Sequence, residues 1–219
     1  MDGITINGVL IKKLESAGLM VKSSDMVIYV DPSGLGDVKV PEDYMADMIL
    51  ITHEHFGHCD PDSIRKVRRS DCTTLIPENM SLQFRGDARR VMAGDSLAGE
   101  LSIKGVDIEV LPAYDSCENG RSSGEGVGYF FTIGNLAIYH AGHTCDVADM
   151  SPLSPDLVVL PIGGGQVMDF KKAGDAAATL DPGYILPVCY GSDSGGNEYP
   201  TGFVDIVKEK IPSAEVLLF

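Results

Sequence analysis

The chain has 219 residues, a formal net charge of −15 and ordinary apolar and charged fractions of 44% and 22%. This length suits one domain, residues 1–219, with a sizeable hydrophobic core. The acidic balance disfavours nucleic-acid binding, which needs a basic surface, and no apolar run approaches the roughly 18 residues that span a bilayer.

The first residues, 1–5, lack the basic and apolar regions of a secretory signal. We therefore expect a cytoplasmic protein without a membrane partner. Five cysteines are odd in number and widely scattered, so neither a disulfide framework nor a zinc ribbon can be read from them. We expect reduced thiols at all five: Cys59, Cys72, Cys117, Cys145 and Cys189.

Short apolar or alternating runs open the chain and predict strands at residues 4–11, 19–22 and 26–30. A helix is expected at residues 41–47. The strand that follows, 48–52, is apolar throughout and therefore buried on both faces. Asp60-Pro61-Asp62 predicts a helix start with Asp60 as the N-cap, and that helix should run to about Arg68.

The second part of the chain repeats this pattern. Strands are predicted at residues 73–76, 106–113, 127–133, 136–140, 157–162 and 184–188. Helices are predicted at residues 81–86, 170–180 and 202–210, and the polar residues 115–125 predict a mobile loop. Strands with interspersed helices in two similar halves favour two sheets packed face to face, with helices outside.

All five histidines lie in two short segments: His53, His55 and His58, then His140 and His143. The first three follow a buried strand and precede a helix start. Side chains at i and i+2 of an extended segment point the same way, so His53 and His55 can share one metal ion, and His58 can face the same space. Neutral imidazole is a common zinc ligand. His140, on the strand itself, is better explained as an orienting or packing residue.

These segments resemble motifs of the metallo-β-lactamase superfamily, in particular its ascorbate-6-phosphate-lactonase-like branch of metal-dependent hydrolases. Residues 50–58, LITHEHFGH, resemble its His-x-His-x-Asp-His signature, and residues 138–144, IYHAGHT, resemble its YHAGDT segment. Residues 160–164, LPIGG, and 187–191, PVCYG, resemble later stretches of that branch, and residues 28–32 match an early strand that ends in Asp-Pro. The resemblance implies a four-layer αββα sandwich.

The sequence departs from the family at the metal positions. Gly57 replaces the signature Asp, His143 the bridging Asp, and Cys189 the last His, while Asp115 aligns with the middle ligand. Two interpretations follow. The site is rebuilt around one ion, or the protein is a non-catalytic relative that keeps only the scaffold for a binding or structural role.

The first interpretation predicts a hydrolase that uses Zn²⁺, or alternatively Mn²⁺, with one ion rather than two. His53, His55, Asp115 and His143 would hold the ion, and His58 and Cys189 would support it. Asp115 and His143 are also the expected catalytic residues. With Gly57 in place of the signature Asp, the general base that the resemblance implies is missing, and Asp115 or Asp193 could replace it. The branch resemblance suggests a small anionic substrate, such as a sugar-phosphate lactone or a phosphodiester. Members of this branch commonly self-associate, so a homo-oligomer is an expected partner.

Overall fold

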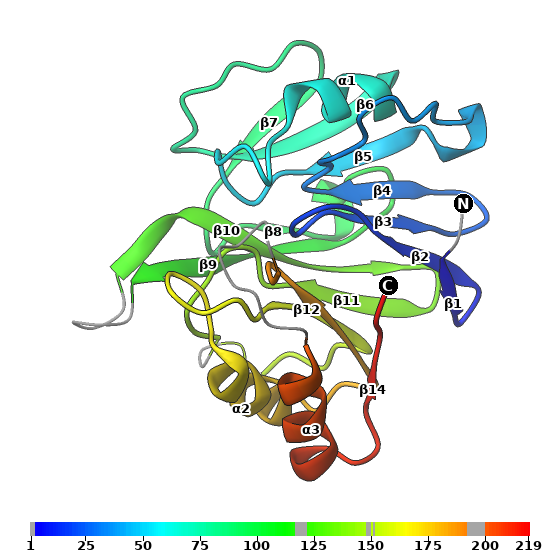
Figure 1. The fold of residues 1–219 in the computed structure, drawn as a ribbon. Coiled ribbons are helices and arrows are strands. Elements are labelled where there is room, and N and C mark those ends of the chain that lie inside the picture. Colours follow the sequence, from blue (N-terminus) through cyan, green and yellow to red (C-terminus); the bar gives the residue numbers. More distant parts are fainter. Residues whose placement is uncertain (1–2, 117–121, 148–149, 151, 192–199) are drawn as a thin grey trace.

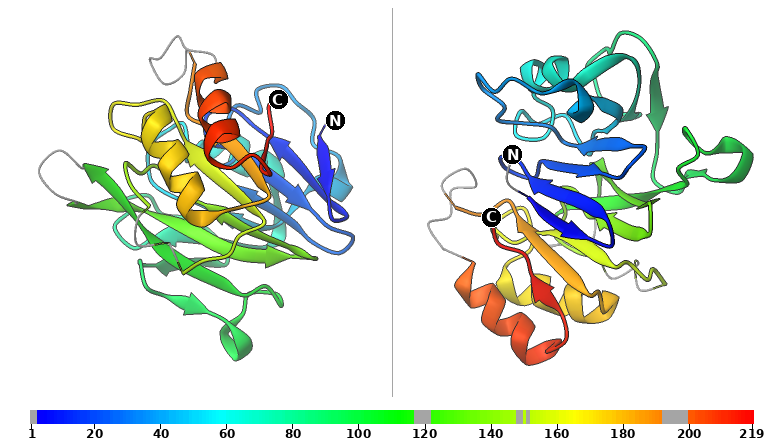
Figure 2. Two further views of the ribbon diagram at one scale, coloured as in Figure 1. Left: turned by 90° about the horizontal axis from the view of Figure 1, so that it is seen from below. Right: turned by 90° about the vertical axis from the view of Figure 1, so that its right-hand side faces the viewer.

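The computed structural model describes residues 3–116, 122–147, 150, 152–191 and 200–219. Two seven-stranded sheets pack face to face, and helices lie on both outer faces (Figure 1). Figure 2 shows the same layers from two further directions, with α2 and α3 together on one outer face and α1 on the other. This is the αββα sandwich that the family resemblance implies.

The first sheet has the order β1-β2-β3-β4-β5-β6-β7. Its first four strands form an antiparallel meander, and β4 to β7 are parallel. The strands are β1 (Ile4–Ile6), β2 (Val9–Lys13), β3 (Leu19–Lys22), β4 (Val27–Val30), β5 (Ala46–Leu50), β6 (Arg68–Pro77) and β7 (Ala88–Val91).

The second sheet repeats this plan in the order β14-β13-β12-β11-β10-β9-β8. Strands β8 to β11 are antiparallel, and β11 to β14 are parallel. The strands are β8 (Ser96–Leu97), β9 (Ile108–Ser116), β10 (Ser122–Ile133), β11 (Leu136–His140), β12 (Leu157–Pro161), β13 (Tyr184–Val188) and β14 (Glu215–Val216).

Helices α1 and α2 each begin after an aspartate that serves as the N-cap. Asp60 caps α1 by accepting from the Asp62 N–H at 3.0 Å, and Asp169 caps α2 by accepting from the Lys172 N–H at 2.8 Å. Such caps satisfy backbone donors that have no partner inside the helix. No helix among the described residues is long and apolar enough to cross a membrane. The helices are α1 (Pro61–Val67), α2 (Phe170–Leu180) and α3 (Thr201–Lys210), with 3₁₀ turns η1 (Glu42–Tyr44) and η2 (Gly99–Leu101).

Three apolar clusters hold the layers together. The largest lies between the two sheets and includes the fully buried Leu19 and the aromatic rings of Tyr129 and Phe131. A second cluster joins the second sheet to α2 and α3 through Phe203, and a third joins the first sheet to α1 through Ile64. Each sheet is therefore covered on both faces, as expected for strands that are apolar throughout.

The structure corrects two predicted helices. Residues 41–47 form only the turn η1, because β5 begins at Ala46 and its pairing with β4 and β6 satisfies more backbone groups than one helical turn can. Residues 81–86 form no helix. A helix this short needs a buried apolar face, and Leu82 is exposed.

The structure also adds strands that the sequence did not predict, namely β7, β8 and β14. The predicted loop at residues 115–125 is largely a hairpin, because β9 runs to Ser116 and Ser122 of β10 pairs with it. Residues 117–121 lie outside the described part of the chain. These unpredicted strands lack an apolar pattern of their own and form because a neighbouring strand supplies their hydrogen bonds.

Candidate metal centre

The candidate site lies at the edge where the carboxyl ends of parallel strands from both sheets meet. Strand β4 leads into Asp31, β5 into His53, β11 into His143 and β13 into Cys189. Segments that are far apart in the sequence thereby deliver their side chains to one place. Loops at the carboxyl ends of strands are a common location for ligand sites in α/β folds.

The loop between β5 and α1 carries three of the histidines. His53 and His58 are buried and His55 is exposed. The His58 N–H donates to the His55 carbonyl oxygen at 2.8 Å, which closes a turn just before the N-cap of α1. This turn brings His58 back toward His53, so the i and i+5 imidazoles lie side by side with ring centroids 3.9 Å apart.

A glycine turn after β11 aims His143 at the same place. Gly142 has a φ of +69°, and a Cβ there would lie 2.6 Å from the Val127 carbonyl oxygen. Only glycine fits this close approach in the left-handed region without strain. The bend separates His143 from His140, whose buried ring bonds instead to Ala17 O at 2.9 Å and to the Gly142 N–H at 3.2 Å. Both ring nitrogens of His140 therefore form hydrogen bonds within the protein, which agrees with the predicted orienting or packing role.

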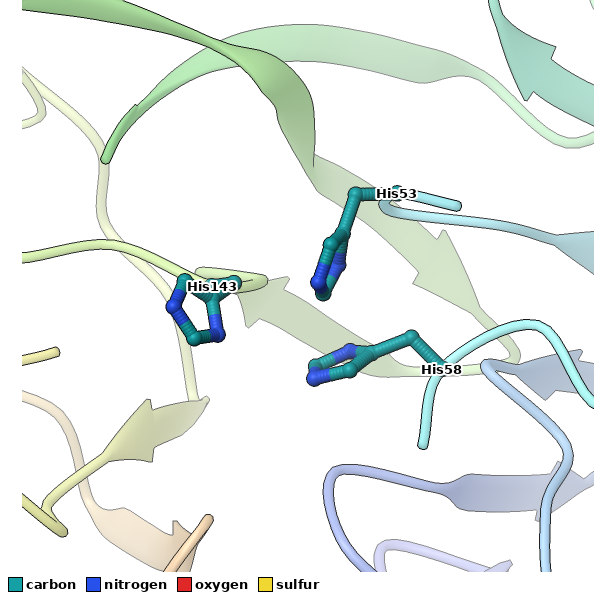
Figure 3. A group of neighbouring side chains, drawn as sticks. All are labelled: His53, His58 and His143. Carbon is teal, nitrogen blue, oxygen red and sulfur yellow. The ribbon is translucent and has the colours of Figure 1, made fainter. Parts of the chain in front are cut away.

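His53, His58 and His143 point toward one another (Figure 3). One ring nitrogen from each lies within 4.8 Å of the others. The pKa values of His53 and His58 are both lowered, to about 3 for His58, chiefly because burial disfavours the charged imidazolium and then because the other imidazoles lie close. Neutral imidazoles are the form that binds a metal ion.

A buried carboxylate orients one of these rings. Asp31, which is fully buried, accepts from the Thr52 N–H at 2.7 Å and from the Thr52 hydroxyl at 2.5 Å. Its Oδ2 lies 2.6 Å from His58 Nδ1. Both Thr52 groups donate to the carboxylate of Asp31, and a carboxylate only accepts. We therefore place the proton of the His58–Asp31 hydrogen bond on Nδ1 of His58, which leaves the lone pair of this imidazole on Nε2. A carboxylate behind a histidine is the usual arrangement around protein-bound metals.

Burial raises the pKa of Asp31 to about 7, against the opposing effect of nearby His140 and the Thr52 hydrogen bonds. A cation at the three histidines would favour the ionised carboxylate. The donor set therefore fits a divalent ion, because three neutral imidazoles could bind it directly and the Asp31 carboxylate lies on the far side of the His58 ring.

The other predicted ligands take different places. His55 Nδ1 lies 2.9 Å from His53 Nε2, outside the group of three but next to it. Cys189 is buried at the same cavity, where burial raises the pKa of its thiol to about 12. Asp115 lies on β9, but its side chain, like all of Asp193, is outside the described residues. Glu54 turns away from the histidines and accepts from the Ser81 N–H at 2.6 Å.

Sequence reasoning missed the roles of Asp31 and Thr52. In the sequence Asp31 marks only the end of a strand, and it lies 27 positions before His58. The parallel pairing of β4 with β5 places the two strand ends side by side. An Asp after one buried strand, with a histidine after the next strand, is the pattern that could have indicated the contact.

A cavity of about 350 Å³ opens in front of the histidines. Its walls include Ser16, Gly57, Cys189 and the glycine-rich segment 164–167, besides the four histidines of the site. This volume lies at the lower end of the range for small-molecule sites, roughly 300–1,000 Å³. The arrangement can hold an ion and admit a small ligand beside it.

Among the described residues, the cysteines outside the cavity divide into two kinds, and Cys117 lies outside the described part of the chain. Cys59 and Cys72 are buried free thiols, as expected. Cys145 is disulfide-bonded, which corrects the expectation of reduced thiols at that position. Scattered sequence positions do not reveal which cysteines the fold brings within bonding distance.

Comparisons with known proteins agree with the fold and with the kind of site. A sequence profile described as the beta-lactamase superfamily domain matches residues 10–189. A UPF0173 metal-dependent hydrolase of Thermococcus kodakarensis is 30% identical over 96% of this chain and 96% of its own.

Solved structures show the same similarity. A protein of Parabacteroides distasonis, described as a metal-dependent hydrolase, has a TM-score of 0.80 at 28% identity and covers 99% of this chain and 96% of its own. A metallo hydrolase of Ignicoccus hospitalis has a TM-score of 0.75 at 23% identity, with 96% and 94% covered. At 23% identity, the second structure supports only the similarity of the fold.

Proposed function

This chain belongs to the beta-lactamase superfamily and has the metallo-β-lactamase fold, and we propose that it is a metal-dependent hydrolase. Its substrate would be a small anion, and its site would hold one metal ion. One observation carries the proposal: nitrogens of His53, His58 and His143 lie within 4.8 Å of one another at the mouth of a cavity. Three protein ligands with an open position are typical of catalytic metal sites.

His53, His58 and His143 would hold the ion, Zn²⁺ or alternatively Mn²⁺, with His55 next to them. When bound, such an ion polarises a carbonyl or phosphoryl oxygen and lowers the pKa of water toward about 7. Asp31 keeps the His58 ring in place and its proton on Nδ1. His143 replaces the superfamily's bridging Asp, and Gly57 removes a ligand of a second ion, so the donors support one ion.

The missing base is the chemical weakness of the site, because Gly57 stands where the superfamily has an Asp. We propose that Asp115 accepts the proton instead. It directly follows Tyr114, whose N–H and carbonyl bond to the Thr144 hydroxyl and the Cys145 N–H, each at 3.0 Å. The backbone at Asp115 therefore runs beside the segment that carries His143.

The substrate class follows from the size of the cavity and from the metal. A cavity of about 350 Å³ suits a small molecule. On a protein with a net charge of −15, an anion needs a local cation to bind, and the ion itself supplies it. The resemblance to the lactonase-like branch suggests a sugar-phosphate lactone or a phosphodiester as the first compounds to try.

Metal content tests this function directly. We would count Zn, Mn, Fe and Ni in the full chain purified without chelator or added metal, and compare His53→Ala with Glu54→Gln. Glu54 lies in the same loop as His53 but its side chain bonds to Ser81 between β6 and β7, so its variant controls for disturbance of the histidine loop. We expect about one ion per chain, lost in His53→Ala and kept in Glu54→Gln.

Two other results would overturn the proposal. Two ions per chain would mean that the remaining side chains complete a dinuclear site despite Gly57. A folded wild-type protein without any ion, which also fails to take up added zinc or manganese, would favour the non-catalytic scaffold.

A further inference from the structure

A second and larger cavity lies on the outer face of the first sheet. Its volume is about 830 Å³, and residues of α1, the start of β6 and the segment 82–86 line it. The connection between β6 and β7 loops out beside α1 at this place (Figure 1). The cavity lies outside the histidine site, because no residue lines both, although Cys59 of this cavity directly follows His58 in the sequence.

Four arginines gather around this cavity. The chain carries 17 basic against 32 acidic residues, so such a grouping runs against its overall charge. Three come from α1 and the start of β6, and the fourth comes from the loop opposite. They are Arg65, Arg68, Arg69 and Arg85.

Two of these guanidinium groups have no carboxylate partner among the described residues. Arg69 pairs with Asp47, and Arg65 pairs with Asp62 at 2.8 Å on the exposed surface. Arg68 donates to the backbone carbonyl of Arg85, which ties the two sides of the cavity together and leaves both charges uncompensated. Arginines held in this way present planar donors that match phosphate and carboxylate oxygens.

The rest of the lining is largely apolar. Ile64 is buried beneath the cavity, and Phe84 and Leu82 reach it from the loop, with Leu82 37% exposed. Apolar surface beside uncompensated guanidinium groups suits a ligand that is itself part charged and part apolar.

We propose that this cavity binds a small anion with an apolar part, joined to a phosphoryl or carboxylate group. Arg68 and Arg85 contact the anionic group, and Ile64, Leu82 and Phe84 contact the apolar part. The site is separate from the metal centre and takes its ligand without a metal ion.

Phenylphosphonate is a suitable probe, because its C–P bond resists hydrolysis of the kind proposed for the metal centre. We would titrate it by calorimetry into the full chain freed of metal by chelation. One equivalent should bind to the wild type. Arg85→Gln should weaken binding by about fivefold or more, since a guanidinium contact to the anion is lost. Arg89→Gln is the matched control, because Arg89 is exposed on β7 and pairs with Asp87 outside the cavity. It should change the affinity by less than about twofold, because its charge is already paired with Asp87 and it does not line the cavity.

Further variants keep the test decisive. Arg68→Gln removes the other proposed contact to the anion and replaces Arg85→Gln if that variant fails to fold. His53→Ala should bind the probe as tightly as the wild type. Benzoate, compared with phenylphosphonate, shows whether the site prefers a carboxylate or a phosphoryl group. Absence of binding at millimolar concentration, equal weakening by Arg85→Gln and Arg89→Gln, or loss of binding in His53→Ala would each overturn the proposal.

Discussion

Replacing Asp31 by asparagine tests whether the buried carboxylate prepares His58 for a metal ion. The two side chains have the same shape, so the change alters hydrogen bonding more than packing. The substituted side chain can still accept from the Thr52 N–H through its oxygen. Its amide nitrogen would take the place of Oδ2, which now accepts from the Thr52 hydroxyl and lies 2.6 Å from His58 Nδ1.

Two donors cannot share that contact. The amide would therefore favour the His58 tautomer that carries its proton on Nε2, and this proton would occupy the lone pair that faces His53 and His143. Loss of a carboxylate behind a metal-binding histidine typically weakens metal affinity by about 10–100-fold. This corresponds to about 1.4 to 2.8 kcal/mol of binding free energy. We expect Asp31→Asn to fall in this range for zinc.

The assay is competition for zinc between the protein and a chromogenic chelator of known affinity. Asp60→Asn is the matched control, because Asp60 is a buried carboxylate two residues from His58 that caps α1 by accepting from the Asp62 N–H and the Ser63 hydroxyl. Asparagine caps helices about as well as aspartate, so this variant should keep its zinc affinity within about twofold. Circular dichroism of both metal-free variants verifies that they fold. A folded Asp31→Asn protein with wild-type zinc affinity would refute the role assigned to Asp31.

Three further predictions concern the ion count, a buried hydroxyl and a buried thiol. Gly57→Asp restores the ligand that the superfamily has at this position and should raise metal content from one ion toward two; an unchanged count would contradict the aligned site. Tyr139→Phe should not destabilise the fold, because the buried Tyr139 hydroxyl has no hydrogen-bond partner among the described residues. Tyr129→Phe should lower the free energy of unfolding by about 1–2 kcal/mol, since its hydroxyl donates to a buried carbonyl at 2.8 Å. Denaturant titrations compare the two, and an equal loss in both would contradict the distinction. Burial raises the pKa of Cys72 to about 11, so mass spectrometry after iodoacetamide treatment of the native protein at pH 8 should find this thiol unmodified, and rapid modification would contradict its burial.

Elements with their own sequence pattern could be predicted closely. Helix α2 has the predicted bounds, because a capping Asp and an Ala-rich run determine it locally. Strands β3 and β13 also match, since each is a short apolar run. Strands β7 and β8 could not be predicted, because they carry Arg and Ser residues and form only where β6 and β9 already present an edge.

The candidate site divides in the same way. The histidines could be selected from their spacing and from the strand that precedes them. Which of them meet could not be predicted: His58 was expected to support the site, yet it lies within the group of three, and His55 lies beside it. The turn that closes between His55 and His58 decides this, and it depends on where α1 begins and on the contact with Asp31.

The buried polar groups favour a metal centre over a scaffold that has lost its function. Asp31, Thr52, His53 and His58 are all buried at one point, and burial disfavours the charged forms of the carboxylate and of both imidazoles. Replacing such a network by apolar side chains of similar volume is often neutral or stabilising, so folding alone gives little reason to keep it. A divalent ion held by His53, His58 and His143 would supply the missing compensation, because it would bind the imidazole lone pairs and favour the ionised carboxylate of Asp31. If the network serves the ion, removing the metal should lower the melting temperature of the wild type and leave that of His53→Ala unchanged, since only the wild type gains stability from binding.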